Sequence, residues 1–277
     1  SLTAPAYAAA GAYTADLSST VPGPTTVSAT LNGTAVTSTV DVTFAAGAPA
    51  GATSQITASS ATMSTDDDVT ISVQLKDQYN NDATGTSDVV LLSSSLTGSS
   101  IGALTAQGAG LYTATLTSTA VGDAEIAGTV NGNAIVDGVT IAIAPGAPVA
   151  SQSVLTVTAN TFTTDETITA RVDLKDAYGN QTSGTTDAVA ISSSRIGTTV
   201  GDITAESAGS YVATISSSVI GTTDITATLS GDGVSNSETV TVNPGTAILA
   251  NSTVSVSSTT LSTDDVVTVS VQLKDVD

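Results

Sequence analysis

Apolar and polar residues alternate in short runs along most of this chain. In residues 68–76, for example, Val69, Ile71, Val73 and Leu75 are separated by polar side chains. An alternation with a period of two is typical of a β-strand that buries one face and exposes the other. Thr, Ser, Val, Ala and Gly dominate the composition while Glu, Lys and Arg are scarce, which disfavours helices. The pattern therefore predicts an all-β protein.

The pattern recurs with a constant spacing of 99 residues. Lys76-Asp77 returns as Lys175-Asp176 and again as Lys274-Asp275, and the numbers differ by 99 each time. Two further markers keep the same spacing: Tyr13, Tyr112 and Tyr211, and Gly47, Gly146 and Gly245. Three independent markers with one spacing indicate a tandem array of a single domain.

The period divides the chain into four segments. Residues 49–147 and 148–246 are complete repeats, each of a size that can bury its own core. Residues 1–48 match the C-terminal part of a repeat, and 247–277 match the N-terminal part. Short junctions at Pro145-Gly146 and Pro244-Gly245 restrict the backbone, so we expect an elongated, semi-rigid rod.

Each complete repeat is expected to fold as a seven-stranded antiparallel sandwich. In the first, the alternation predicts strands near 54–58, 67–76, 88–93, 102–105, 110–117, 123–130 and 138–144. The predicted core residues are Ile56, Ala58, Val69, Ile71, Val73, Leu75, Val90, Leu92, Leu104, Tyr112, Ala114, Leu116, Ile126, Val130, Val139, Ile141 and Ile143. Those of the second are Leu155, Val157, Ile168, Ala170, Val172, Leu174, Val189, Ile191, Ile203, Tyr211, Ala213, Ile215, Ile225, Leu229, Val240 and Val242. Tyr13 shares this register, so it is also expected to pack in a core.

Two segments carry a family resemblance. Residues 173–184 read Asp-Leu-Lys-Asp-Ala-Tyr-Gly-Asn-Gln-Thr-Ser-Gly, and 208–229 contain Gly-x-Tyr followed by alternating apolar residues. Both resemble segments of the bacterial Ig-like domains of invasin and intimin adhesins. The resemblance covers both complete repeats and part of the incomplete ones. Asn80 stands where the family has Gly, and because Asn tolerates a left-handed conformation we expect the turn to be kept.

The resemblance implies a structural role at the cell surface or outside the cell. The favoured function is a stalk or spacer segment of a large extracellular bacterial adhesin. Its partners would be neighbouring repeats of the same or identical chains, and a host or cell-surface receptor bound through other domains. The alternative is a segment of a self-assembling surface layer or extracellular fibre. An enzyme or a carbohydrate-binding domain is disfavoured, because the two complete repeats differ mostly by conservative surface substitutions.

The charge and the missing residue types exclude other classes. A net charge of −20 disfavours binding to nucleic acid or to an anionic membrane. No apolar run approaches the ~20 residues that span a bilayer, so no membrane insertion is expected. The chain has no His and no Cys, which removes the commonest catalytic base and all thiolate chemistry. Asn32, Asn180 and Asn251 begin N-glycosylation patterns, which chance explains in a chain rich in Ser and Thr.

Calcium is the one ligand that the acidic residues suggest, and no cofactor is required. The loops of a sandwich would place Asp66, Asp67 and Asp123 of one repeat at the end that faces Asp176 of the next. Carboxylate oxygens are the ligands that calcium prefers. The dense Asp-x-Asp spacing of dedicated calcium loops is missing, however, and solvated acidic turns are the favoured explanation of these residues.

Overall fold

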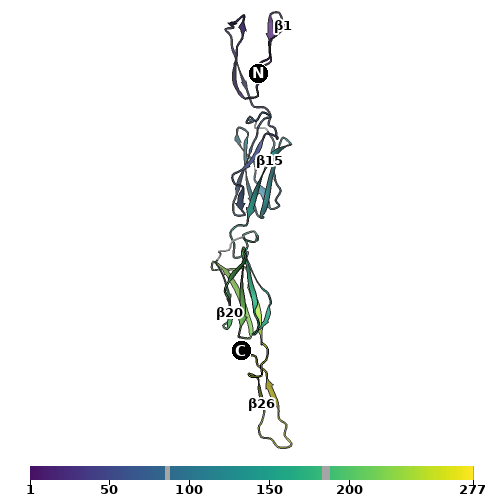
Figure 1. The fold of residues 1–277 in the computed structure, drawn as a ribbon, viewed down its shortest axis with the longest axis vertical. Coiled ribbons are helices and arrows are strands. Elements are labelled where there is room, and N and C mark those ends of the chain that lie inside the picture. The colour runs from purple at the N-terminus through teal and green to yellow at the C-terminus, as the bar shows by residue number, and fades with distance from the viewer. Residues whose placement is uncertain (85–87, 183–187, 277) are drawn as a thin grey trace. The chain divides into compact units, whose positions relative to one another are not determined.

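The computed structural model describes residues 1–84, 88–182 and 188–276, and in these ranges it contains strands β1 to β27 and no helix. The predicted all-β class is confirmed. No helix long and apolar enough to cross a membrane occurs in the part of the chain that is described. The chain divides into two compact units, Ser1–Ala144 and Pro145–Asp277 (Figure 1).

The first unit begins with three two-stranded sheets. They pair β1 (Ala6–Ala9) with β2 (Ala12–Thr14), β3 (Gly23–Val27) with β6 (Val40–Phe44), and β4 (Thr30–Leu31) with β5 (Thr34–Ala35). Tyr13 is 67% exposed and meets the ring of Tyr7 edge to face at 5.6 Å. Among the described residues no second layer covers these strands, so the prediction that Tyr13 packs in a core is not met here.

The first complete repeat follows as a two-layered sandwich. Its strands are β7 (Gln55–Ala58), β8 (Thr62–Ser64), β9 (Val69–Gln74), β10 (Val90–Ser94), β11 (Ser99–Ile101), β12 (Thr105–Gly108), β13 (Leu111–Ser118), β14 (Gly122–Val130) and β15 (Asn133–Ala144). One layer has the order β7-β9-β13-β11, with β12 also pairing with β13. The other has the order β10-β14-β15, with β8 running parallel to the end of β15. A parallel pairing of Asp137 on β15 with Gln55 on β7 joins the two layers into one nine-stranded sheet. This is the arrangement of an Ig-like sandwich.

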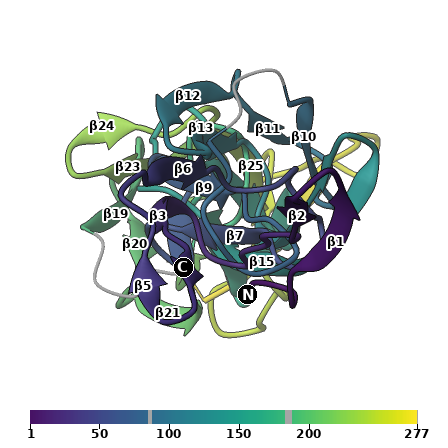
Figure 2. The ribbon, with the colours of Figure 1, turned by 90° about the horizontal axis from the view of Figure 1, so that it is seen from above.

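The second unit contains the same sandwich. Its strands are β16 (Val154–Val157), β17 (Thr161–Thr163), β18 (Ile168–Asp173), β19 (Val189–Ser193), β20 (Thr198–Val200), β21 (Thr204–Ser207), β22 (Ser210–Ser217), β23 (Gly221–Leu229), β24 (Asp232–Gly233) and β25 (Glu238–Asn243). One sheet has the order β16-β18-β22-β20 and the other β17-β25-β23-β19. Figure 2 labels β19, β20, β23 and β25 of this sandwich. The resembling segment 173–184 continues into residues 183 and 184, which lie outside the described ranges.

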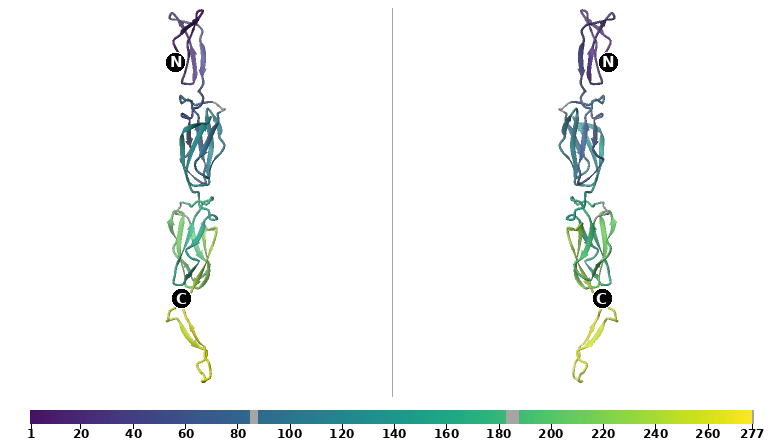
Figure 3. Two further views of the ribbon diagram at one scale, coloured as in Figure 1. Left: turned by 90° about the vertical axis from the view of Figure 1, so that its right-hand side faces the viewer. Right: turned by 90° about the vertical axis from the view of Figure 1, so that its left-hand side faces the viewer.

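The unit ends with a hairpin of β26 (Thr253–Val256) and β27 (Val269–Gln272). Neither view of Figure 3 shows a second layer over it. Its apolar side chains Val254, Val269 and Val271 are exposed, although their counterparts 99 residues earlier, Leu155, Ala170 and Val172, are buried.

All predicted core residues of both complete repeats pack in the cores or against them. The cores also contain residues that the alternation does not mark, among them Met63, Ala83, Ile135 and Phe162. Met63 and Phe162 lie on β8 and β17, strands of three residues that are too short to show a period. The strand predicted at 102–105 is instead two short strands, β11 and β12, on either side of Gly102.

Candidate functional site: the joint between repeats

The Lys-Asp marker of the repeat forms a turn built around a buried carboxylate. Asp77 follows β9 and is only 2% exposed. Its Oδ1 accepts hydrogen bonds from the backbone amides of Tyr79 at 2.9 Å and Asn81 at 3.0 Å. The amide side chain of Asn81 donates to Oδ1 at 3.0 Å and to Oδ2 at 2.9 Å. Asn80 adopts φ of 68°, which confirms that Asn replaces Gly in this turn without a change of conformation.

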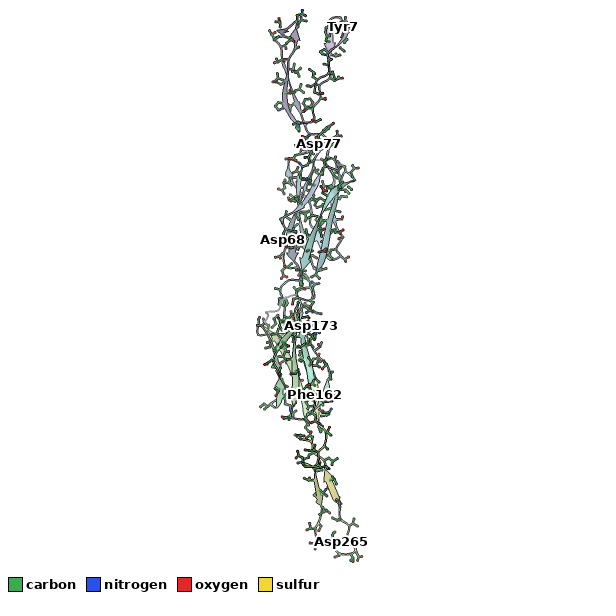
Figure 4. All side chains as sticks on the ribbon, viewed as in Figure 1. Tyr7, Asp68, Asp77, Phe162, Asp173 and Asp265 are labelled. Carbon is green, nitrogen blue, oxygen red and sulfur yellow. The ribbon has the colours of Figure 1, made fainter. Side chains whose placement is uncertain are left out.

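The same carboxylate also holds the linker that enters the repeat. The backbone amide of Gly47 donates to Oδ2 of Asp77 at 2.9 Å. The hydroxyl of Thr53 donates to the carbonyl of Asp77 at 2.8 Å, so the backbone of the turn is held as well. Two markers of the 99-residue period are thus in direct contact. Figure 4 labels Asp77 at the end of the sandwich where this linker enters.

The hydrogen bonds to Asp77 favour its charged form. The side-chain amide of Asn81 is the largest influence, followed by burial, which acts in the opposite direction, and then by the backbone amides of Gly47, Asn81 and Tyr79. Together they lower the pKa of Asp77 from 3.8 to about 2. The carboxylate is therefore ionised at neutral pH, when its hydrogen bonds are strongest.

Asp176 repeats this arrangement in the second unit. It is fully buried, and its Oδ1 accepts the amides of Tyr178 and Asn180, each at 2.9 Å. The amide side chain of Asn180 lies 2.8 Å from Oδ2. The linker amide of Gly146 donates to Oδ2 at 3.2 Å. The turn is thus a constant feature of the repeat.

The third copy shows a contact with the preceding repeat. Gly245 donates its amide to Oδ2 of Asp275 at 2.7 Å and to the hydroxyl of Thr164 at 3.0 Å. That hydroxyl in turn donates to Oδ2 of Asp275 at 3.0 Å. Since Thr164 lies in the turn between β17 and β18, one carboxylate joins the linker to the repeats on both of its sides.

The neighbouring Asp165 holds the next linker residue. Its Oδ2 accepts the amide of Thr246 at 2.6 Å. A Cβ atom on Gly245 would lie 2.4 to 2.6 Å from the carboxylate of Asp165. A side chain at position 245 would therefore displace the exposed carboxylate of Asp165.

At the first joint, the contact across the linker comes from Asn81, in the turn around Asp77. The side chain of Asn81 donates to the carbonyl of Thr20 at 2.8 Å. A groove of about 400 Å³ lies beside this joint, lined in part by Val21, Pro22 and Tyr79. A comparable groove of about 430 Å³ lies beside Gly245, with Val219 and Pro244 in its lining. Val21 and Val219 are separated by 198 residues, which is two periods of the repeat. They therefore line equivalent grooves.

The structure places the candidate calcium ligands in different surroundings. Asp66, Asp67 and Asp123 are exposed. The carboxylate of Asp67 accepts the hydroxyl of Ser64 at 2.7 Å and its amide at 3.0 Å, and these bonds lower the pKa of Asp67. The oxygens of buried Asp176 accept N–H groups instead. Among the described residues of either unit, no group of three or more acidic side chains could hold a metal ion. Calcium binding by the four residues together stays a prediction.

The sequence shows which residues of the joint are constant, but it does not show that they are in contact. Its signal is the 30-residue separation between the linker Gly and the Asp, kept at Gly47 and Asp77, Gly146 and Asp176, and Gly245 and Asp275. The Asn four residues after the Asp is a second signal, found in both complete repeats.

Comparison with known proteins identifies the repeat. Residues 50–146 and 149–245 each match the family described as invasin, domain 3. The chain has no significant match among curated proteins.

Solved structures of adhesins share the fold. The Escherichia coli adhesin FdeC is 23% identical, with a TM-score of 0.55 over 87% of this chain and 81% of that one. Invasin, a bacterial integrin-binding protein, is 27% identical, with a TM-score of 0.55 over 84% of this chain and 48% of that one. InvD of Yersinia pseudotuberculosis is also 27% identical, with a TM-score of 0.51 over 80% of this chain and 70% of that one.

This chain therefore spans about half the length of the invasin structure. The two family matches together cover well over half of the residues here. The chain belongs to the invasin domain 3 family, as tandem Ig-like domains of a bacterial adhesin.

Proposed function

We propose that these residues form a spacer segment of a bacterial surface adhesin. The observation that carries the proposal is the joint, where an Asp of one repeat accepts the amide of the linker Gly that precedes it, and this Asp is buried in both complete repeats. Proline alone restricts such a linker only in part, because its glycine keeps its conformational freedom. A linker held at its amide loses that freedom, so successive repeats keep their direction. That property serves a spacer and has no evident use in a freely swinging chain.

Thr164 and Asp165 extend this restriction to the preceding repeat. They bind Gly245, Thr246 and Asp275, so the linker is held from both sides. The contacts use hydrogen bonds to charged carboxylates, which are stronger than bonds between neutral groups. A spacer built in this way resists bending at its linkers.

The receptor partner follows from the relatives. Invasin is an integrin-binding protein, and this chain matches only part of it. We place receptor binding in domains beyond these residues and the chain itself at the bacterial surface or outside the cell. Its own partners are neighbouring repeats.

Deletion of one repeat tests the spacer role. The chain is displayed between a cell-surface anchor and a tip domain of known ligand, with and without residues 148–246. This deletion removes one whole period and restores the junction register. The spacer role predicts a shorter distance between tip and surface and an unchanged affinity of the tip. Binding of host cells by the isolated chain, with loss of that binding on deletion, would contradict it.

Electron microscopy of the purified chain addresses assembly into a layer or fibre. Isolated particles support the spacer, whereas ordered lattices or filaments with interfaces above ~1,000 Å² support assembly.

A further inference from the structure

In both complete repeats, a strand near the start of the repeat lies beside the last strand and runs in the same direction. β8 pairs in parallel with residues 142–144 of β15, and β17 pairs in parallel with residues 241–243 of β25. A further backbone bond extends the first ladder, where the amide of Thr65 donates to the carbonyl of Ala144 at 3.0 Å. In the second, the amide of Thr164 donates to the carbonyl of Asn243 at 3.1 Å.

The parallel direction places the entry and the exit of the chain at opposite ends of each sandwich. In the second repeat, β16 begins beside Asp173, whereas β25 ends beside Phe162 and Thr163. Figure 4 labels Asp173 and Phe162 towards opposite ends of this sandwich. A force on the two ends of a repeat therefore acts along its strands.

This geometry decides how the repeat responds to tension. Pulling on both ends slides the first and last strands past each other along their own direction. All hydrogen bonds of the parallel ladder then carry the load together. In a hairpin that is pulled at its two free ends, the bonds break one after another, each at a lower force. The parallel ladder is thus the part of the repeat that is suited to tension.

A buried side chain holds each of the short strands against sliding. Met63 in the middle of β8 is 7% exposed and Phe162 in the middle of β17 is 3% exposed. A strand that slips by one residue turns its inward side chains towards solvent. Sliding would therefore withdraw Met63 or Phe162 from the core, which the loss of apolar burial opposes.

The two repeats link the first strand to the last one by different means. In the first repeat, the backbone of Asp137 on β15 pairs in parallel with Gln55 on β7. The second repeat has Asn236 at the position of Asp137. Its Oδ1 accepts the amide of Leu155 on β16 at 2.9 Å, and its Nδ2 donates to the carbonyl of Leu155 at 2.8 Å. One side chain thus makes both hydrogen bonds that the backbone of a parallel neighbour would make.

We propose that the pairing of the first strands with the last strand carries tensile load in each repeat, and that the Asn236 side chain completes it in the second. The use of this property rests on the proposed spacer function, since a tip domain bound to a host cell pulls on the segment behind it. The load path itself follows from the hydrogen bonds within each repeat.

Asn131 provides a matched control, because its amide side chain also joins two segments of a sandwich. Its Oδ1 accepts the amide of Val89 at 2.9 Å, and its Nδ2 donates to the carboxylate of Asp88 at 2.9 Å. These bonds join the turn after β14 to the start of β10, and neither segment belongs to the first or the last strand pairing. The second repeat has Ser230 at this position, in the same backbone conformation, so serine is tolerated there.

Unfolding of single molecules at constant force tests the proposal. The chain contains no Cys, so one cysteine added at each end attaches a handle at a defined place. Each complete repeat should unfold in one step of roughly 300 Å. In Asn236→Ser, whose shorter side chain cannot reach both groups of Leu155, we expect one of the two steps to occur at least about tenfold faster. The other step should keep its rate.

The control separates load bearing from ordinary stability. Urea unfolding should show that Asn236→Ser and Asn131→Ser are both folded and both less stable than the parent chain. Under load, however, Asn131→Ser should keep both steps within about twofold of their parent rates. Unchanged steps in Asn236→Ser, or equal acceleration in the two variants, would overturn the proposed load path. Neither result would touch the spacer role, which the deletion of residues 148–246 tests separately.

Discussion

The backbone amide of Gly47 donates a 2.9 Å hydrogen bond to the buried carboxylate of Asp77, although 30 residues separate them. This contact fixes the linker to the repeat that it introduces. The equivalent pairs Gly146 with Asp176 and Gly245 with Asp275 show that it is part of the repeat design. Its consequences can be measured at single residues.

Replacing the carboxylate should release the linker. In Asp77→Asn, an amide group replaces one of the oxygens that accept from Gly47 and Asn81, so at least one donor loses its acceptor. We expect a lower melting temperature and about tenfold faster exchange of the Gly47 amide proton. Asp82→Asn is the control, because Asp82 is exposed and its ion pair with Lys76 contributes little. If the Gly47 amide proton exchanged at the same rate in the two variants, the Asp77 carboxylate would not be what holds the linker.

The ionisation of Asp77 should appear as acid sensitivity. Its pKa is about 2 in the folded chain, below the ordinary value of 3.8. Folding therefore gains from the charged form above pH about 3.8, and this gain is lost as the pH falls from about 4 towards 2. Urea unfolding across this range should show a smaller decline in Asp77→Asn than in the parent. A parallel decline in both would mean that Asp77 does not contribute.

The glycines of the linkers should differ in their tolerance of alanine. A Cβ on Gly245 would lie 2.4 to 2.6 Å from the Asp165 carboxylate, whereas one on Gly47 would meet nothing closer than 3.5 Å. We expect Gly245→Ala to displace Asp165 and to shift the amide resonance of Thr246. Gly47→Ala should leave its joint intact. If Gly245→Ala leaves its joint as unchanged as Gly47→Ala does, the linker at Gly245 is not closely packed against Asp165.

A buried hydroxyl offers a stabilising substitution. Thr182 is buried, and its Oγ1 has no partner in the described part of the chain. The first repeat has Ala83 at this position. Thr182→Val should raise the free energy of unfolding by about 1 kcal/mol, since an unpaired polar atom is removed.

Thr223 provides the matched control for that substitution. It is equally buried, but its hydroxyl pairs with that of Ser193 at 2.7 Å. Thr223→Val should therefore destabilise the chain. If both variants shift stability in the same direction, the unpaired state of Thr182 is not the cause.

Calcium is tested by thermal unfolding. If Asp66, Asp67, Asp123 and Asp176 bind the ion, millimolar calcium raises the melting temperature by mass action on the folded state. Asp123→Asn should reduce that rise, and magnesium, which demands a stricter geometry, should reproduce little of it. An unchanged melting temperature would remove the hypothesis.

Much of the fold could be predicted from the sequence. The alternation around Ile71 and Ile168 predicted the buried faces, because each layer of a sandwich exposes one side and buries the other. Strands of three residues, such as β8 with Met63, could not be predicted since they hold too few positions for a period. Tyr13 follows the pattern and is still exposed, because burial depends on a covering layer that lies elsewhere in a repeat.

The joint could be located in the sequence but its chemistry could not be derived. The spacing marked Gly47 and Asp77 as constant features, yet a spacing does not show that two residues touch. The contact requires the path of the chain through the turn at Asn80 and back to the linker. The contribution of Thr164 was invisible for the same reason, since it lies 111 residues from Asp275.

Backbone ¹⁵N relaxation at Gly47, Gly146 and Gly245 tests most directly the central claim that the aspartates Asp77, Asp176 and Asp275 hold the linkers. A held linker gives order parameters near 0.85, like those of the strands, and Asp77→Asn should lower the value at Gly47 alone. Order parameters below about 0.6 at the three glycines of the parent chain would contradict the account.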